Sequence, residues 1–184
     1  EKVGVKLDKN GQIETNDMFQ SSIKNIYAIG DAKSGPMLAH KASEEGTAVA
    51  ELISGQAGHV NYNTIPSVIY TSPEVASVGK TEEELKLQNI KFKVGKFPFS
   101  ANAKAKVMND TNGFVKIISD NETDEVLGVH IIGSDAGNLI AELVVAMEFG
   151  ASAEDLARTC HAHPTLTESI KEAALNVEKS SIHI

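Results

Sequence analysis

The sequence predicts an α+β fold, in which an antiparallel sheet is covered by helices, preceded by a smaller α/β segment. Short segments rich in β-forming residues follow one another after about residue 62 and give way to helical periodicity near the end. Before residue 62, one apolar segment is followed by a loop and a long helical pattern. The polar stretch SGQAGHVNYNT (54–64) separates the two parts, so we place a domain boundary between residues 1–61 and 62–184.

The first part is predicted to contain a hairpin, a strand and a helix. In VGVKLDKNGQIET (3–15), Asn10 and Gly11 stand between two short β-type segments, as in a tight hairpin turn. Residues 26–29 form an apolar strand that stops at a glycine, and a helix is predicted over 37–53. This order of strand, loop and helix is that of an α/β unit.

The second part is predicted to be a sheet of short strands followed by helices. The expected strands are PSVIYT (66–71), ASVG (76–79), FKVGKF (92–97), GFVKII (113–118) and EVLGVHII (125–132). The last two flank the polar turn SDNETD and should pair as an antiparallel hairpin. Thr81 and Glu84 have the spacing of a capping box that opens a short helix. The later helices are expected over 135–149, 153–158 and 166–176, and the first should bury Leu139, Ile140, Leu143, Val144 and Met147.

Composition and charge narrow the classes of function. With 41% hydrophobic and 23% charged residues, the chain has the composition of a globular protein with a real core. Lys plus Arg is 17 and Asp plus Glu is 25, which gives a net charge of −8, and Arg158 is the one arginine. This balance argues against nucleic-acid binding. The apolar run over 139–149 is interrupted by Glu142 and Glu148, so no membrane span is expected, and no secretory signal is expected either.

The turn after residue 29 is a candidate binding site. Gly30 lets the backbone come close to a ligand, and Asp31 at the end of a strand offers a carboxylate to hydroxyl groups. A helix that starts at about Met37 adds free N–H groups and the positive end of its dipole. The residues alone leave a simpler interpretation open, in which Asp31 caps its own turn.

The stretch CHAHPTLTES (160–169) is the richest in chemical groups. Cys160, His161 and His163 could each bind a metal ion. However, no second Cys or His group lies at a spacing that would complete a tetrahedral site, so we expect no metal. A serine-hydrolase site is not expected either, because the GxSxG pattern is absent.

Two further interpretations of this stretch involve Glu168. Pro164 favours an extended His163 and suits an early helical position, while Thr165 and Glu168 have the spacing of a capping box. Alternatively, Glu168 bonds one ring nitrogen of His163 and leaves the other free, so that His163 acts as a general acid/base. The interpretations make opposite demands, because the carboxylate either reaches back to the backbone or holds the imidazole.

The first part resembles a known flavin-binding motif. IYAIGDAKSGPMLAHKASEEG (26–46) is similar to the second flavin-binding motif of the pyridine nucleotide–disulfide oxidoreductases, and GPMLAHKA resembles the members of that family that act on dihydrolipoamide. The resemblance implies FAD as a cofactor, with Gly30 at the turn and the Asp31 carboxylate on a ribitol hydroxyl. It also implies that Met37, Leu38 and Ala39, at the helix start, face the pyrimidine side of the flavin ring.

The second part resembles the same family. CHAHPTLTESIKEAAL (160–175) is similar to its C-terminal signature, and PSVIYTSPEVASVGKTEEELKLQ (66–88) to the start of its dimerisation domain. The resemblance implies a homodimer in which His163 and Glu168 reach the flavin site of the other subunit. There His163 would take a proton from a dihydrolipoamide thiol, the thiolate would attack a redox disulfide, and electrons would pass through FAD to NAD.

The resemblance also implies partners and a location. The partners would be lipoyl domains of 2-oxo acid dehydrogenase complexes or of the glycine cleavage system, with neither nucleic acid nor membrane. The location would be the cytoplasm of a bacterium or the mitochondrial matrix of a eukaryote.

Parts of this family's machinery are not found in the chain. No two glycines are separated by one residue, so the GxGxxG fingerprint for FAD pyrophosphate or NAD is absent. Cys160 is the one cysteine, so a redox cysteine pair is absent too. We expect Cys160 itself to be a buried small residue. The chain, which begins at Glu1, is therefore expected to be the C-terminal piece of an FAD-binding domain followed by an interface (dimerisation) domain, with an incomplete FAD site, no NAD site and no activity alone.

Two alternatives stay open. The parent protein could be another flavin disulfide reductase, similar to glutathione reductase. The chain could instead be a non-catalytic module for dimerisation or docking.

Overall fold

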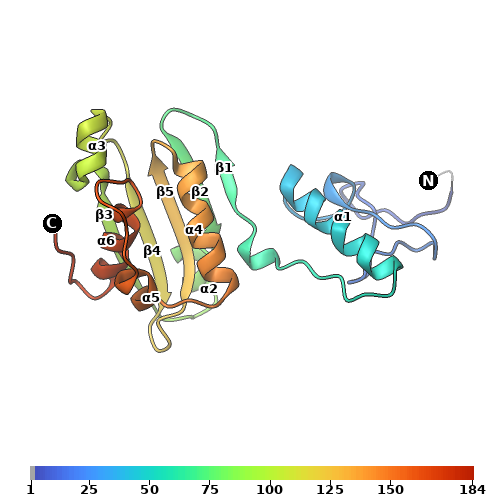
Figure 1. The fold of residues 1–184 in the computed structure, drawn as a ribbon. Coiled ribbons are helices and arrows are strands. Elements are labelled where there is room, and N and C mark those ends of the chain that lie inside the picture. The colour runs from blue at the N-terminus through green and yellow to red at the C-terminus, as the bar shows by residue number, and fades with distance from the viewer. Residues whose placement is uncertain (1–2) are drawn as a thin grey trace. The chain divides into compact units, whose positions relative to one another are not determined.

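Figure 1 shows the computed structural model of the chain, which describes residues 3–184. The chain divides into two compact units, the first ending at Tyr62 and the second covering Asn63–Ile184. The second unit holds the five-stranded sheet and most of the buried apolar side chains. None of the helices formed by residues 3–184 is long and apolar enough to cross a membrane.

The hairpin expected over 3–15 is a turn without long strands. Leu7 and Ile13 make a single antiparallel bridge, and Gly11, which lies between them, has a φ of +82°. The Gly11 N–H donates to the backbone oxygen of Asp8, and the Asp8 carboxylate accepts the N–H of Asn10. The turn at Asn10 and Gly11 is therefore confirmed, whereas the flanking strands shrink to one bridge.

The prediction of a strand over residues 26–29 is wrong. Tyr27 makes one isolated bridge, to Gln20, and Gly30–Ala32 is a short 3-10 helix. A strand needs neighbours to pair its N–H and C=O groups, and residues 3–62 supply no ladder for this segment. Helix α1 (Ala39–Ile53) begins two residues later than predicted, because Leu38 keeps an extended backbone.

The second unit contains an antiparallel sheet with the strand order β1-β2-β5-β4-β3 (Figure 1). Its strands are β1 (Ser67–Ile69), β2 (Glu74–Gly79), β3 (Phe92–Pro98), β4 (Phe114–Asp120) and β5 (Val126–Gly133). The hairpin predicted around the SDNETD turn is formed by β4 and β5. Since β5 pairs with both β2 and β4, the last strand along the chain is the centre of the sheet.

The helices of the second unit are α2 (Glu82–Leu87), α3 (Ala103–Met108), α4 (Ala136–Glu148), α5 (Ala153–Arg158) and α6 (Glu168–Val177). Of these, α4, α5 and α6 form a layer on one face of the sheet. Helix α4 packs on β2 and β5, α6 packs on β3 and β4, and α5 lies beside α6 (Figure 1). This arrangement confirms the predicted α+β class.

Most of the predicted helix features are confirmed. Helix α4 buries the side chains of Leu139, Ile140 and Leu143 in the core. Its Val144 and Met147 pack at the edge of the same core. The Thr81–Glu84 capping box is present at the start of α2. Helix α3 was not predicted, although Asn102 caps it by accepting the Ala105 N–H.

Glycine 95 sets how closely α6 approaches β3. A Cβ atom at this position would lie 2.0 Å from the backbone oxygen of Ala173 and 2.5 Å from the backbone nitrogen of Val177. The absence of a side chain therefore lets the helix rest directly on the strand. Because α6 starts at Glu168, this contact fixes the helix that carries the candidate catalytic carboxylate.

Candidate functional site

His163 and Glu168 form a hydrogen-bonded pair at the start of α6. His163 Nδ1 lies 2.8 Å from Glu168 Oε1. The imidazole side chain is 70% exposed and the carboxylate side chain 22% exposed. The sequence prediction that Glu168 holds His163 therefore agrees with the geometry, and the ring faces solvent while its partner is partly buried.

The second oxygen of Glu168 binds the backbone. The Thr165 N–H donates to Glu168 Oε2 at 2.9 Å, so one carboxylate holds both the imidazole and the turn. From the sequence, the bond to the His163 ring and the bond to the backbone are expected to exclude each other. Glu168 makes both, because each bond uses a different oxygen atom.

The expected capping box forms only in part. The Thr165 hydroxyl donates to the backbone oxygen of Ala162 instead of accepting an N–H from Glu168, and α6 begins at Glu168, not at residue 166. Pro164 follows a cis peptide bond and lies ahead of the helix, not in its first turn. The turn is thus closed by local hydrogen bonds before the helix starts.

The surroundings favour the ionised form of Glu168. Partial burial acts to raise its pKa, but the hydrogen bonds from the Thr165 N–H and from His163, and the charges of His163 and His183, outweigh burial. The pKa of Glu168 therefore lies below its ordinary value. An ionised carboxylate can only accept, so the neutral His163 ring carries its proton on Nδ1 and presents the Nε2 lone pair. Such a ring can accept a proton from a substrate.

Cys160 and His161, the other candidate ligands in CHAHPTLTES, take no part in this pair. His161 Nε2 lies 2.8 Å from Glu142 Oε1, and its side chain is almost fully buried. Cys160 is exposed, so its predicted burial is wrong: it follows the end of α5, where the chain leaves the core. Within residues 3–184 no three His, Cys, Asp or Glu side chains gather as a metal site.

A second His–Glu pair, which sequence reasoning missed, lines the same small cavity. His183 Nδ1 lies 2.7 Å from Glu172 Oε1, and both pairs border a space of about 50 Å³ next to Phe97. Glu172 follows Glu168 by four residues, which places both carboxylates on one side of α6. That spacing was a usable signal for Glu172, whereas nothing around His183 in the sequence pointed to it.

The candidate flavin-binding residues lie at the N-terminal end of α1. Gly30 has a φ of +61°, and the exposed Asp31 carboxylate makes no hydrogen bond or ion pair to any of residues 3–184. The alternative in which Asp31 caps its own turn is therefore not realised. Its oxygens are free to accept hydrogen bonds from a polyhydroxy ligand.

The helix start next to this turn is exposed in part. Met37 and Ala39 are exposed, while Leu38 donates its N–H to the backbone oxygen of Pro36. The Ala39 N–H belongs to the first helical turn, where no intrahelical acceptor exists. An accepting carboxylate and a donating helix end thus stand on either side of one short loop. This combination fits the ribityl hydroxyls and the electron-rich ring edge of a flavin.

Comparisons with known proteins match both units. The dimerisation-domain model of the pyridine nucleotide-disulphide oxidoreductases matches residues 65–174, and a second model, pyridine nucleotide-disulphide oxidoreductase, matches residues 1–46. The mitochondrial dihydrolipoyl dehydrogenase of Dictyostelium discoideum is 56% identical over 184 residues, which are 100% of this chain and 38% of that protein. The mitochondrial dihydrolipoyl dehydrogenase of Sus scrofa is 58% identical over 175 residues, 95% of this chain and 34% of that protein.

Two solved structures have a similar fold. LpdA from Mycobacterium tuberculosis superposes with a TM-score of 0.87 at 27% identity, over 93% of this chain and 38% of that one. RclA from Escherichia coli, a flavoprotein disulfide reductase, gives a TM-score of 0.83 at 26% identity, over 91% of this chain and 39% of that one. The chain thus spans little more than a third of the length of each of these proteins. Since the dimerisation-domain model covers more than half of the chain, the chain belongs to the pyridine nucleotide-disulphide oxidoreductase family.

Proposed function

We propose that this chain is part of a dihydrolipoamide dehydrogenase, a flavoenzyme that oxidises protein-bound dihydrolipoamide to lipoamide and passes electrons through FAD to NAD. The observation that carries the proposal is the exposed His163 ring, held at Nδ1 by an ionised glutamate. The relatives named dihydrolipoyl dehydrogenase support this choice of substrate.

In this proposal His163 is the general acid/base. A thiol with a pKa near 8.5 or above is only a few per cent ionised at neutral pH, so little of the reactive thiolate is present without a base. His163 Nε2 takes the thiol proton, and the negative charge of Glu168 stabilises the resulting imidazolium. The Thr165 N–H keeps the carboxylate oriented while the ring changes charge. FAD, when bound, supplies the electron acceptor.

The proposed flavin contacts of this chain come from the first unit. The Asp31 carboxylate would accept a ribityl hydroxyl, with Gly30 allowing the close turn. Of the three residues at the helix start, Ala39 offers a backbone N–H to the flavin ring, and Met37 offers an apolar side chain. The Leu38 N–H already has an acceptor in Pro36, so its share would be smaller. The chain supplies only part of an FAD site and no NAD site.

The proposed assembly is a homodimer that serves lipoyl domains of 2-oxo acid dehydrogenase complexes or of the glycine cleavage system. The match to a dimerisation domain supports the homodimer. Large apolar side chains exposed on the second unit, Tyr70 and Phe149 among them, would be buried by such an interface. For a eukaryotic parent we propose the mitochondrial matrix, as in the relatives named above.

Substitution of His163 by Gln in the full-length enzyme tests the acid/base role. Turnover with dihydrolipoamide should fall by about 10²–10⁴, the usual contribution of a general base, while the FAD content per subunit stays unchanged. His183→Gln is the matched control, because His183 pairs with Glu172 in the same geometry. It should lower turnover by less than about tenfold. An equal loss of turnover in the two variants, or loss of FAD in step with turnover, would show that His163 is structural.

A second candidate is another flavin disulfide reductase, which the likeness to RclA favours. The acid/base pair would serve any thiol substrate equally well. Reduction of lipoamide and of glutathione disulfide by the full-length enzyme separates the two. Faster reduction of glutathione disulfide would reject the dihydrolipoamide assignment and leave the role of His163 intact.

A further inference from the structure

A buried ionic cluster supports the Gly30–Asp31 turn from within α1. Lys41 and Glu45 lie one helical turn apart, their side chains are fully buried, and Lys41 Nζ is 3.6 Å from Glu45 Oε1. Burying an ion pair is costly, and apolar side chains of similar size often give equal or greater stability. The cluster therefore calls for an explanation other than stability.

Both members of the pair bind the backbone of Gly30. The Gly30 N–H donates to Glu45 Oε2 at 2.6 Å, and Lys41 Nζ donates to the Gly30 backbone oxygen at 3.1 Å. A Cβ atom at residue 30 would lie only 2.9 Å from the Cβ of Ala42, so the turn is pressed against the helix. Both polar backbone groups of the residue before Asp31 are thus fixed by two charged side chains.

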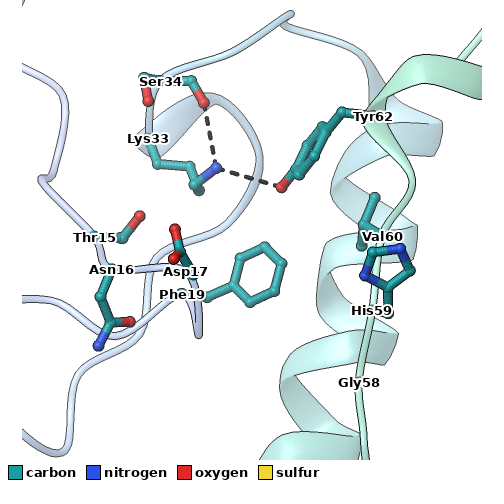
Figure 2. Close-up of a pocket in the computed structure, with 10 residues that line it drawn as sticks. All are labelled: Thr15, Asn16, Asp17, Phe19, Lys33, Ser34, Gly58, His59, Val60 and Tyr62. Atoms are coloured by element: carbon teal, nitrogen blue, oxygen red, sulfur yellow. Dashed lines mark hydrogen bonds between the residues drawn. The ribbon is translucent and has the colours of Figure 1, made fainter.

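Lys33 and Tyr62 complete the cluster at the edge of a cavity of about 410 Å³ (Figure 2). Tyr62 donates its hydroxyl to Glu45 Oε1 at 2.6 Å, and Lys33 Nζ lies 3.3 Å from the same oxygen. The ammonium group of Lys33 also stands over the rings of Phe19 and Tyr62, at 5.6 and 5.4 Å from their centroids. Both Oε atoms of Glu45 therefore accept hydrogen bonds within the cluster.

Glu45 is ionised in this setting. Burial acts to raise its pKa, but the hydrogen bonds from Tyr62 and from the Gly30 N–H, together with the charge of Lys33, lower it by more. With two lysines and one glutamate, the cluster carries one net positive charge.

We propose that Glu45 and Lys41 are positioning residues for the flavin, which hold the Gly30 peptide so that the Asp31 carboxylate is aimed at a ribityl hydroxyl. The inference rests on the proposed function as an FAD enzyme. The Asp31 carboxylate makes no hydrogen bond or ion pair with residues 3–184, so the backbone before it sets where this carboxylate is placed. A turn fixed in advance does not lose conformational freedom on binding, which strengthens affinity without adding a contact.

The first test uses the full-length enzyme stripped of FAD and reconstituted. Glu45→Gln removes the charge that balances two lysines and weakens the bond to the Gly30 N–H. The dissociation constant for FAD, measured by quenching of flavin fluorescence, should rise about 10- to 100-fold, the value of one hydrogen bond to a charged group. Glu44→Gln, the same change at the neighbouring exposed residue, should alter it less than about twofold.

A double variant separates positioning from folding, because Glu45→Gln leaves buried lysines unbalanced and will also lower stability. Glu45→Leu combined with Lys41→Met removes one charge of each sign, keeps the net charge of the cluster and removes both side-chain contacts to Gly30. The thermal midpoint of its apoprotein should return toward the wild-type value, while FAD affinity stays at least about tenfold weaker.

Three results would be decisive. Recovery of FAD affinity together with the thermal midpoint in the double variant would make the cluster purely structural. Wild-type FAD affinity in Glu45→Gln would also overturn the inference, yet leave the proposed function standing. Failure of the unmodified full-length protein to bind FAD would instead reject the proposed function itself.

Discussion

Replacing Gly95 by Ala should loosen the contact between β3 and α6, and with it the start of the helix that carries Glu168. The added Cβ would lie 2.0 Å from the backbone oxygen of Ala173. Side chains essentially never approach that closely: real contacts stay beyond 3.0 Å, so α6 has to withdraw by 3.0 − 2.0 = 1.0 Å or more. The obstructing atoms are backbone, so no rotamer change can relieve the clash.

The energetic cost follows from this displacement. A gap of about 0.5–1 Å forfeits a quarter to a half of each dispersion contact, and overpacking of a core costs about 1–3 kcal/mol. Helix α6 buries Ile170, Ala173, Ala174 and Val177 against the sheet, so we expect about 3 kcal/mol, the upper end of that range. This corresponds to roughly a hundredfold rise in the equilibrium constant for local opening.

Hydrogen exchange read by mass spectrometry measures that opening in peptides covering 92–98 and 168–177. Gly46→Ala is the control: it lies inside α1, where the new Cβ meets ordinary contact distances, and it should stabilise that helix by about 1 kcal/mol. The control should leave exchange in the two peptides unchanged. Protection in Gly95→Ala within about threefold of the wild-type value would refute the packing argument.

Three further outcomes are expected. Ser169→Ala should raise the free energy of unfolding by about 1–2 kcal/mol in urea titrations, because the buried Ser169 hydroxyl has no hydrogen-bond partner within residues 3–184; a loss of stability would contradict this. Cys160 should react with a thiol reagent in the folded chain nearly as fast as in denaturant, and a rate about a hundredfold slower would mean burial. Since the folded-state pKa of Glu168 lies below its ordinary value of 4.5, its stabilising contribution is present in full above that value and is lost as the pH falls through the folded pKa. The difference in unfolding free energy between wild type and Glu168→Gln should therefore shrink as the pH falls from 7 to 3, and a constant difference would contradict the pairing.

The elements of the second unit could be predicted because local patterns and the final packing agree there. The apolar residues of 135–149 repeat with helical spacing, and the same residues are buried in α4. The predicted strands are separated by polar turns, and the five strands pair as expected for an antiparallel sheet. In the first unit, the pattern of residues 26–29 is that of a strand, but a strand depends on partners that residues 3–62 do not provide.

The candidate site could be predicted only where its residues are close in sequence. His163 and Glu168 are five residues apart, and the bond between them follows from one local turn. His183 reaches Glu172 from a distance of 11 residues, and Tyr62 reaches Glu45 from 17, so both contacts depend on how the chain returns to a helix. The Glu45 cluster was further hidden because KASEEG reads as an ordinary polar helix face until burial is known.

The shared use of Glu168 limits how far this segment can vary. One carboxylate binds both the Thr165 turn and the His163 ring, so a substitution at residue 168 affects the local fold and the proposed proton transfer at the same time. An aspartate, one methylene shorter, would have to give up one of the two partners. Selection acting on turnover at residue 168 therefore also acts on stability, and an engineer cannot trade one property for the other there.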